Sequence, residues 1–307
     1  AGFTIAQTGG STSVAETGTT DTFTIVLNAQ PASNVVLDIT SSDTGEATVT
    51  STLTFTNGNW NTAQTVTVTG VDDNIIDGTI SSTITASIDD ANSDNNFDNL
   101  PDQTLTATTT DNDVAGFTIA ETGGSTSVAE TGTTDTFTIV LNAQPASNVV
   151  LTVTSSDTGE ATVTSSLTFT NANWNTPQTV TVTGVDDNLI DGNVNSKITI
   201  VVDDANSDND FDAVANQTVT ATTTDNDVAG FTIVESSGST SVAETGTTDT
   251  FTVVLNAQPS SDVVLSISSA DAGELTTSGS LTFTNANWNT AQTVTVTGVD
   301  DNLIDGN

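Results

Sequence analysis

The chain has 307 residues, of which 39 are Asp or Glu and only one, Lys197, is basic, so its formal net charge at pH 7 is −38. This charge excludes nucleic acid as a partner and argues against anionic membrane surfaces, because both require clustered Lys and Arg. Cys, His, Met and Tyr are absent, which removes disulfides, zinc sites and thiol or imidazole catalysis. No apolar run approaches the roughly 20 residues of a membrane-spanning helix. We therefore expect neither membrane insertion nor enzymatic activity.

A unit of 114 residues repeats along the chain, because the string Ala-Gly-Phe-Thr-Ile begins at Ala1, Ala115 and Ala229. Residues 8–37 and 122–151 are identical in sequence. Each unit has the size of an ordinary domain, so we predict three domains, at 1–114, 115–228 and 229–307, the third incomplete. Tandem copies are typical of proteins that need length or several binding modules, and they are less expected for an enzyme with one active site.

Apolar residues alternate with Thr and other polar residues in short segments separated by turn clusters, which predicts β-strands with one buried face. In the first repeat we expect a broken strand over 3–14 and further strands at 23–27, 35–39, 53–55, 65–69, 84–88 and 105–107. The chain is therefore predicted to be all-β, with tandem immunoglobulin-like antiparallel β-sandwiches of about seven strands each, arranged as beads on a string. The one Trp of each repeat, Trp60, Trp174 or Trp288, is expected to cap an end of the core.

Acidic residues occupy the loops at one end of this predicted sandwich. If the strands alternate in direction, the first, third and fifth loops meet the end of the last strand. In the first repeat these segments carry the following acids: Glu16, Asp21, Asp43, Glu46, Asp72, Asp73, Asp77, Asp111 and Asp113. Two carboxylates about 5 Å apart repel by roughly 3 kcal/mol at an effective dielectric constant near 20. A hard cation relieves the repulsion, and Ca²⁺ accepts about six to eight oxygens in the flexible geometry that loops supply.

The fifth loop carries the string Val-Asp-Asp-Asn-(Ile/Leu)-Ile-Asp-Gly in every repeat, at 71–78, 185–192 and 299–306. Calcium binding is the preferred interpretation of this string. The alternative is that its Asp and Asn residues serve turns and solubility. The predicted ligands are equivalent acids of the three repeats: Glu16, Asp43, Asp72, Asp73, Asp77, Asp111, Asp113, Glu130, Asp157, Asp186, Asp187, Asp191, Asp225, Asp227, Glu244, Asp271, Asp300, Asp301 and Asp305.

A second candidate lies at the opposite end, where residues 90–98 and 204–212 place oxygen-bearing side chains at every second position. This spacing is similar to that of a helix–loop–helix calcium loop, but Asn95 stands where such a loop has Gly, and Pro101 stands where it has a bidentate Glu. A solvated polar loop and a weaker metal site both fit this segment. Its candidate ligands are Asp90, Asn92, Asp94, Asp98, Asp204, Asn206, Asp208 and Asp212.

The whole unit resembles the Calx-β domain, the calcium-binding sandwich of sodium–calcium exchangers and of large bacterial surface proteins. The matching strings are S-V-A-E at 13–16, L-T-F-T at 53–56, Q-T-V-T-V at 64–68, the acidic string at 71–78 and T-T-T-D-N-D at 108–113. The resemblance implies calcium coordination by these residues and their counterparts in the second repeat: Glu16, Asp43, Asp72, Asp73, Asp111 and Asp113. The chain departs from the family in having Asp77-Gly78 where paired Glu is usual and Asn112 within the closing Asp run.

Only Val114, Ala115 and Gly116 separate the acidic end of one repeat from the first strand of the next, so bound calcium should stiffen the joint. We predict a calcium-stiffened spacer, stalk or filament segment of a secreted or cell-surface microbial protein. Its expected partners are neighbouring repeats, other copies of the chain and, where the protein is adhesive, a glycan or surface ligand. Two alternatives are a calcium-dependent carbohydrate-binding module and a filament subunit whose third repeat is completed by strands of another chain.

Overall fold

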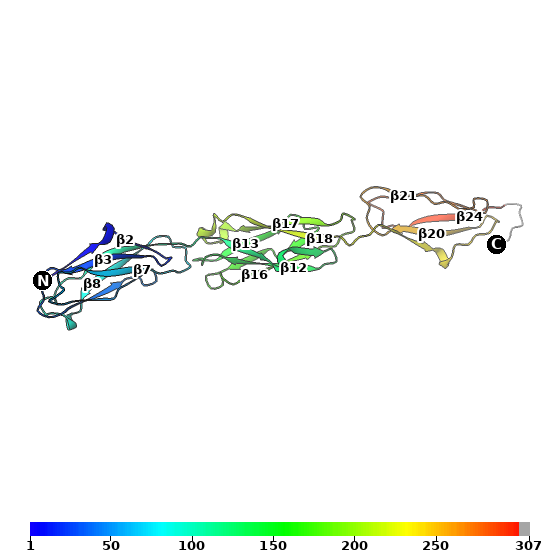
Figure 1. The fold of residues 1–307 in the computed structure, drawn as a ribbon. Helices are drawn as coiled ribbons and strands as arrows, with labels where there is room; N and C mark the ends of the chain where they lie inside the picture. The colour runs from blue at the N-terminus through cyan, green and yellow to red at the C-terminus, as the bar shows by residue number, and fades with distance from the viewer. Residues whose placement is uncertain (301–307) are drawn as a thin grey trace.

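The computed structural model describes residues 1–300, in which three β-sandwiches follow one another in a row (Figure 1). Regular structure in this range consists of β-strands and short 3-10 turns. No helix within residues 1–300 has the length and apolar content needed to cross a membrane.

The first repeat is a two-layer sandwich with the strand orders β1-β3-β7-β5 and β2-β9-β8-β4-β6. Its strand pairs are antiparallel except that β2 and β9 run parallel, with Thr12 opposite Ala107. The strands are β1 (Phe3–Gln7), β2 (Thr12–Ala15), β3 (Thr20–Leu27), β4 (Val35–Ser41), β5 (Ala47–Val49), β6 (Thr52–Phe55), β7 (Gln64–Gly70), β8 (Ile80–Ile88) and β9 (Gln103–Thr110).

The second repeat has the same topology, with the orders β10-β12-β16-β14 and β11-β18-β17-β13-β15. Its strands are β10 (Phe117–Glu121), β11 (Thr126–Ala129), β12 (Thr134–Leu141), β13 (Val149–Ser155), β14 (Ala161–Val163), β15 (Ser166–Phe169), β16 (Gln178–Gly184), β17 (Val194–Val202) and β18 (Gln217–Thr224). The 3-10 turns of the described chain are η1 (Thr8–Gly10), η2 (Asp90–Asn92), η3 (Thr122–Gly124), η4 (Asp204–Asn206), η5 (Asn209–Phe211) and η6 (Ser236–Gly238).

The predicted immunoglobulin-like sandwich is confirmed, but one expected strand divides between the two sheets and one strand, β5, was not predicted. The first divides into β1 and β2 at Gly9 and Gly10, whose φ angles of 76° and 88° suit glycine and turn the chain from one sheet to the other. The strand expected at 53–55 lies in β6 and is preceded by β5 in the opposite sheet. The three residues of β5 are too few to show the alternation on which the strand predictions depended.

Each complete repeat has its own apolar core between its two sheets. Along β3, Phe23, Ile25 and Leu27 point inward at alternate positions and are at most 2% exposed. Phe97, from the loop between β8 and β9, is buried in the same core. Trp60 is partly buried against that core, which confirms the expected capping role.

The third repeat keeps a four-stranded sheet, β19-β20-β24-β22, and a two-stranded sheet, β21-β23. The sequence to Asn307 contains no counterpart of β8 or β9, and residues 240–243, the counterpart of β2, form no strand because β2 pairs with β9. Phe231 is 52% exposed, whereas the equivalent Phe3 and Phe117 are each 3% exposed. The strands are β19 (Phe231–Glu235), β20 (Thr248–Leu255), β21 (Val263–Leu265), β22 (Leu275–Thr277), β23 (Leu281–Phe283) and β24 (Gln292–Gly298).

Candidate metal centre

Four segments bring acidic side chains together at one end of the first repeat: the end of β2, the β4–β5 loop, the β7–β8 loop and the segment after β9. Backbone hydrogen bonds fix these segments to one another. The Glu16 N–H donates to the Thr110 carbonyl oxygen at 3.1 Å, and the Val71 N–H donates to the Glu46 carbonyl oxygen at 2.8 Å. The pairing of the strands therefore brings the acidic segments together without the help of a bound ligand.

Five carboxylates form two groups that share Glu16, and we call them the acidic cluster. One oxygen from each of Glu16, Glu46 and Asp77 lies within 4.8 Å of the other two, and the same is true of Glu16, Asp111 and Asp113. Glu16 is 1% exposed. The second repeat contains the same two groups, which are Glu130, Glu160 and Asp191, and Glu130, Asp225 and Asp227.

Several oxygens of the acidic cluster are buried without a hydrogen-bond partner among the described residues. They are Oε2 of Glu46 and Oδ2 of Asp113 in the first repeat, and Oε2 of Glu160 and Oδ2 of Asp227 in the second. Glu46 and Glu160 are each only 6% exposed. Buried polar atoms in folded proteins almost always have partners, and a buried unpaired charge costs several kcal/mol (about 3–5). The same unpartnered oxygens occur in both repeats, which makes the cluster a candidate site for a cation.

The pKa values of the carboxyl groups in the cluster are also consistent with a missing counter-charge. Burial raises the pKa of Glu46 to about 7 and that of Glu160 to about 6, and the negative charges of neighbouring acids add to the effect. Burial also raises the pKa of Glu16 and of Asp113. Without a counter-charge, these side chains are held where their charged forms are disfavoured.

The donor set fits calcium. Every member of the acidic cluster offers hard carboxylate oxygens, the side chains come from irregular loops, and the two groups share one carboxylate. Ca²⁺ accepts this kind of flexible all-oxygen environment, whereas Mg²⁺ demands a tighter octahedron and retains its waters.

Asp111 also holds the β7–β8 loop in place. Its Oδ2 accepts hydrogen bonds from the backbone N–H groups of Asp77 at 3.1 Å and Gly78 at 2.9 Å, and its Oδ1 accepts from the Asp113 N–H at 2.6 Å. Gly78 has a φ of 73°, which explains why Gly follows Asp77 at this point. The departure from paired Glu therefore has a structural reason in the loop itself.

Asn112, the other departure from the family, joins three segments. Its backbone N–H donates to Glu16 Oε2 at 3.1 Å, and its side-chain Nδ2 donates to Asp72 Oδ1 at 2.9 Å. Asn226 makes the equivalent two bonds at 3.0 and 2.8 Å. A neutral amide donor thus satisfies Asp72 without an ion.

Some predicted ligands lie beside the two groups of the acidic cluster and are not members of them. Asp72 is bound by Asn112, Asp73 Oδ1 accepts from the Ile75 N–H at 2.7 Å, and Asp43 Oδ1 accepts from the Gly45 N–H at 3.0 Å. The equivalent residues of the second repeat do the same, namely Asp186, Asp187 and Asp157.

The third repeat does not form such a group within residues 1–300. Glu244 is exposed, in contrast to the buried Glu16 and Glu130, and Asp271 and Asp300 are exposed as well. The sequence to Asn307 contains no counterpart of Asp111 and Asp113. The remaining predicted ligands of this repeat, Asp301 and Asp305, lie outside the described residues.

Glu46 and Glu160 were not among the predicted ligands, although each belongs to a group. The available signal was local, because each is followed directly by the short alternating string Ala-Thr-Val. Recognising that string as β5 or β14 would have placed the preceding Glu at the end of a sheet. Without that strand, the sequence places Glu46 with the acids at this end of the sandwich but does not distinguish it as a ligand.

The second candidate segment is organised around one buried Asp in each complete repeat. Asp94 Oδ2 accepts from the Ala32 and Ser33 N–H groups at 2.6 and 3.1 Å, and Oδ1 accepts from the Asn96 N–H at 3.0 Å. Asp208 likewise accepts from the Ser147 N–H at 2.7 Å. The other predicted acidic ligands of this segment do not join either Asp in a group of acids within 4.8 Å. They are Asp90, Asp98, Asp204 and Asp212. The predicted Asn92 and Asn206 donate their side-chain Nδ2 to Asp89 and Asp203 at 2.7 and 2.9 Å. The geometry describes a loop anchored by a carboxylate.

The β7–β8 loop that carries Asp77 also contacts the next repeat. The Asn74 carbonyl oxygen accepts a hydrogen bond from the Gln144 N–H at 2.7 Å, and Ile76 packs against the core of the second repeat. An open hollow of about 350 Å³ lies at this joint, with Ile76, Asp113 and Val214 in its walls. The candidate site and the inter-repeat contact therefore share one loop.

No protein-family model matches the sequence, and no curated protein matches it. Among solved structures, the chain is similar to the calcium binding domain CBD12 of CALX1.1, with 13% identity and a TM-score of 0.27 over 64% of this chain and 79% of that chain. It is also similar to domains 1–6 of the surface layer protein SbsC, with 15% identity and a TM-score of 0.31 over 97% of this chain and 36% of that chain. At these values the similarity concerns the fold alone, so the functional conclusion depends on the geometry described above.

Proposed function

We propose that this chain is a calcium-stiffened structural segment, serving as a spacer, stalk or filament portion of a secreted microbial surface or matrix protein. The observation that supports this function best is the unpartnered buried Oε2 of Glu46 within the acidic cluster, together with the same feature at Glu160. These oxygens lie in a cluster whose loop makes the contact with the next repeat. Ion binding and joint geometry are thereby linked.

The residues of the acidic cluster have two roles in this proposal, which are to bind the ion and to position the β7–β8 loop. Glu16, Glu46 and Asp77 would hold one ion position, and Glu16, Asp111 and Asp113 would hold a second. Bound calcium supplies the positive charge that offsets their mutual repulsion. Asp77 then fixes the loop whose Asn74 and Ile76 contact the second repeat. When the ion is removed, the carboxylates of the acidic cluster repel one another, which displaces this loop and loosens the joint.

The repetition and the composition support an extracellular structural role. Three copies of one unit extend the molecule, and the described residues contain no His or Cys with which to catalyse a reaction. Modular calcium sites outside cells work at the high calcium concentrations found there, with dissociation constants of about 10⁻⁴–10⁻³ M. The carbohydrate-binding and strand-complementation alternatives stay predictions.

The proposal is tested with the full chain by calcium titration calorimetry and by small-angle X-ray scattering, first with calcium and then with chelator. We expect calcium uptake, a higher melting temperature and a larger maximum dimension in calcium than in chelator. Magnesium at the same ionic strength is the matched control and should reproduce little of the effect. Absence of calcium uptake, or an unchanged maximum dimension, would overturn the proposal.

A further inference from the structure

Each complete repeat has open sheet edges, because its two sheets do not close into a barrel. In the first repeat the outermost strands are β1 and β5 in one sheet and β2 and β6 in the other. An outermost strand presents unpaired backbone N–H and C=O groups, which can pair with a strand of another molecule. Because β5 has only three residues, the edges of β1, β2 and β6 are the ones that need protection.

These three edge strands lack the residues that usually protect a sheet edge. Natural edge strands often carry Lys, Pro or another charged residue, which disfavours pairing with a further strand. In the first repeat β1, β2 and β6 contain no charged residue and no Pro. The single basic residue of the chain, Lys197, lies on β17, which has a neighbouring strand on each side. Another kind of protection is therefore required.

A glutamine side chain occupies the open edge of β6. The Ile39 N–H donates to the Ser51 carbonyl oxygen at 2.8 Å, and the pairing continues until Val36 lies opposite Thr54. Backbone groups of successive residues alternate between the two sides of a strand, so the Thr54 carbonyl, three residues after Ser51, points away from β4 toward the free edge. The side-chain Nε2 of Gln64 donates to this carbonyl oxygen at 2.8 Å.

A second glutamine occupies the open edge of β1 in the same way. The Asn28 N–H donates to the Gly2 carbonyl oxygen at 2.8 Å, so the carbonyl of the next residue, Phe3, points to the free edge. The side-chain Nε2 of Gln103 donates to it at 2.7 Å. Gln64 begins β7 and Gln103 begins β9, so each side chain reaches from one sheet to the edge strand of the other.

The edge of β2 is covered by two shorter side chains. The Ser13 N–H donates to Asp21 Oδ2 at 2.9 Å, and the Ala15 N–H donates to Thr19 Oγ1 at 2.7 Å. All three longer edges of the first repeat therefore have backbone groups that are satisfied by side chains.

The second repeat repeats both glutamine contacts. Gln178 donates to the Thr168 carbonyl oxygen at 2.8 Å, and Gln217 donates to the Phe117 carbonyl oxygen at 2.7 Å. The acceptors lie on β15 and β10, which are the outermost strands that correspond to β6 and β1. The arrangement is thus a property of the repeat and not of one copy.

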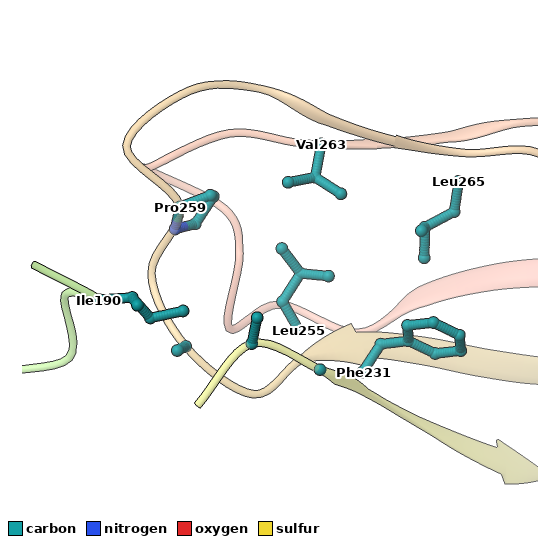
Figure 2. Close-up of a pocket in the computed structure, with 9 residues that line it drawn as sticks. Ile190, Phe231, Leu255, Pro259, Val263 and Leu265 are labelled. Carbon is teal, nitrogen blue, oxygen red and sulfur yellow. The ribbon is translucent and has the colours of Figure 1, made fainter. Parts of the chain in front are cut away.

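The contact at β6 has a counterpart even where the core is open. In the third repeat a pocket of about 160 Å³ is lined by Leu255 of β20 and Val263 of β21, which belong to different sheets (Figure 2). The Gln292 side chain still donates to the Thr282 carbonyl oxygen at 2.7 Å. This contact is therefore set locally by β23 and β24.

We propose that Gln64, Gln103 and their counterparts are edge-blocking residues, which prevent a strand of a second copy of this chain from pairing with β6 or β1. Each occupies a carbonyl oxygen to which the added strand would have to donate. The tandem repeats are nearly identical in sequence, and misassembly between domains is a characteristic failure of repeat proteins. The net charge of −38 also opposes association, but salt screens that repulsion, whereas the glutamine contacts persist.

The test removes the donor while keeping the length of the side chain. The full chain with Gln64→Met and Gln178→Met is studied by sedimentation velocity over a series of concentrations, in chelator and at high ionic strength. Met has no group that can donate to a carbonyl oxygen. We expect dimers and larger species to form as the concentration rises, with an associated fraction several-fold above that of the native chain. Hydrogen exchange at the Thr54 N–H should become slower in the associated form, because this group also faces the edge.

The matched control is Gln30→Met with Gln144→Met. The side chains of Gln30 and Gln144 donate to the carbonyl oxygens of Asn57 and Asn171 at 2.8 and 2.9 Å, and these acceptors lie in loops after β6 and β15. The control therefore removes the same number of similar hydrogen bonds but frees no strand edge, and it should sediment like the native chain.

The chain with Gln103→Met and Gln217→Met tests the β1 edge independently, and circular dichroism shows that each variant is folded. The proposal is wrong if the folded edge variants stay monomeric wherever the native chain does, or if the control associates to the same extent. None of the substituted residues belongs to the acidic cluster, and every measurement is made in chelator. The outcome is therefore independent of whether the chain binds calcium.

Discussion

Glu46 shows how one residue can make a fold depend on its environment. It is 6% exposed, its Oε2 has no partner among the described residues, and burial raises its pKa to about 7. A side chain in this position opposes folding when charged and unpaired, and it becomes favourable when a cation completes it. The stability of the repeat should therefore depend on the ion through this residue.

We expect Glu46→Gln to stabilise the first repeat in chelator and to weaken its response to calcium. The amide removes one of several mutually repelling charges and can donate a hydrogen bond to a neighbouring carboxylate, a change of about 1–3 kcal/mol. Thermal melting in chelator and in calcium measures both effects. Asp102→Asn removes the same charge from an exposed position outside the acidic cluster and should change neither. An equal calcium response in the two variants would contradict the assignment of Glu46.

Asp94 illustrates the opposite case, a carboxylate whose partners are all supplied by the protein. Backbone N–H groups of Asn96, Ser33 and Ala32 hold its pKa at about 2, below the usual 3.8. Because the folded pKa lies below the unfolded one, the stability that Asp94 contributes is present above the unfolded pKa and is lost as the pH falls through the folded pKa. The charged form is the one that the loop requires.

Asp94→Asn should therefore lower the melting temperature at neutral pH, because one amide oxygen cannot replace two acceptors. The difference from the native chain should shrink as the pH is lowered from about 4 to about 2. Circular dichroism melts at a series of pH values measure this difference. Asp90→Asn, at an exposed position in the same segment, is the control and should melt like the native chain. A difference that stays constant down to the lowest pH would show that Asp94 acts through packing alone.

At the scale of elements, the alternation of Thr with apolar residues was enough to predict the strands and the sandwich. Long strands such as β3 and β8 show that pattern clearly, because one face is buried and the other meets water. The pattern could not reveal β5, nor could it show that the first expected strand divides between the two sheets, because those features depend on tertiary hydrogen bonds. For the same reason Glu46 was placed among the acids at this end but not among the ligands, whereas Glu16, Asp77, Asp111 and Asp113 were predicted to lie close together and do so.

The close approach of β7 to β2 offers a test of how the elements position Glu16. A Cβ atom on Gly70 would lie 2.1 Å from the carbonyl oxygen of Ala15, the residue before Glu16. Gly70→Ala should therefore force the two strands apart and destabilise the first repeat by about 1–3 kcal/mol. Calcium affinity should fall with it. Denaturant unfolding and calorimetry measure the two effects.

Gly58→Ala is the matched control for this substitution. A Cβ on Gly58 would meet only the Thr56 Oγ1, at 3.8 Å, and the other repeats already have Ala172 and Ala286 at this position. It should leave stability and calcium affinity unchanged. If Gly70→Ala behaved like Gly58→Ala, the β2–β7 contact would not be what places Glu16.

At the scale of the whole molecule, the joint combines a covalent link with a docked loop. The sequence predicted a short joint beside the acidic end, but it did not reveal that residues 74–76 reach across to the next repeat. That contact joins residues 70 positions apart, Asn74 and Gln144, and no local pattern indicates it. The docked loop therefore gives the two domains a second contact beside the short connection at Val114–Gly116.

Two neighbouring isoleucines of this loop contact the second repeat in different ways, one through its side chain and the other through its backbone. Ile76 packs against the core of the second repeat, whereas Ile75 is 39% exposed and takes part through its backbone bridge to Gln144. Ile76→Ala should remove apolar contact across the joint and shorten the mean end-to-end distance in calcium, because the repeats would bend relative to one another. Ile75→Ala makes the same chemical change and should leave that distance close to the native value. Small-angle scattering of the two variants in calcium compares them directly. Equal dimensions for both would mean that the linker and the ion alone, without the docked side chain, set the direction of the molecule.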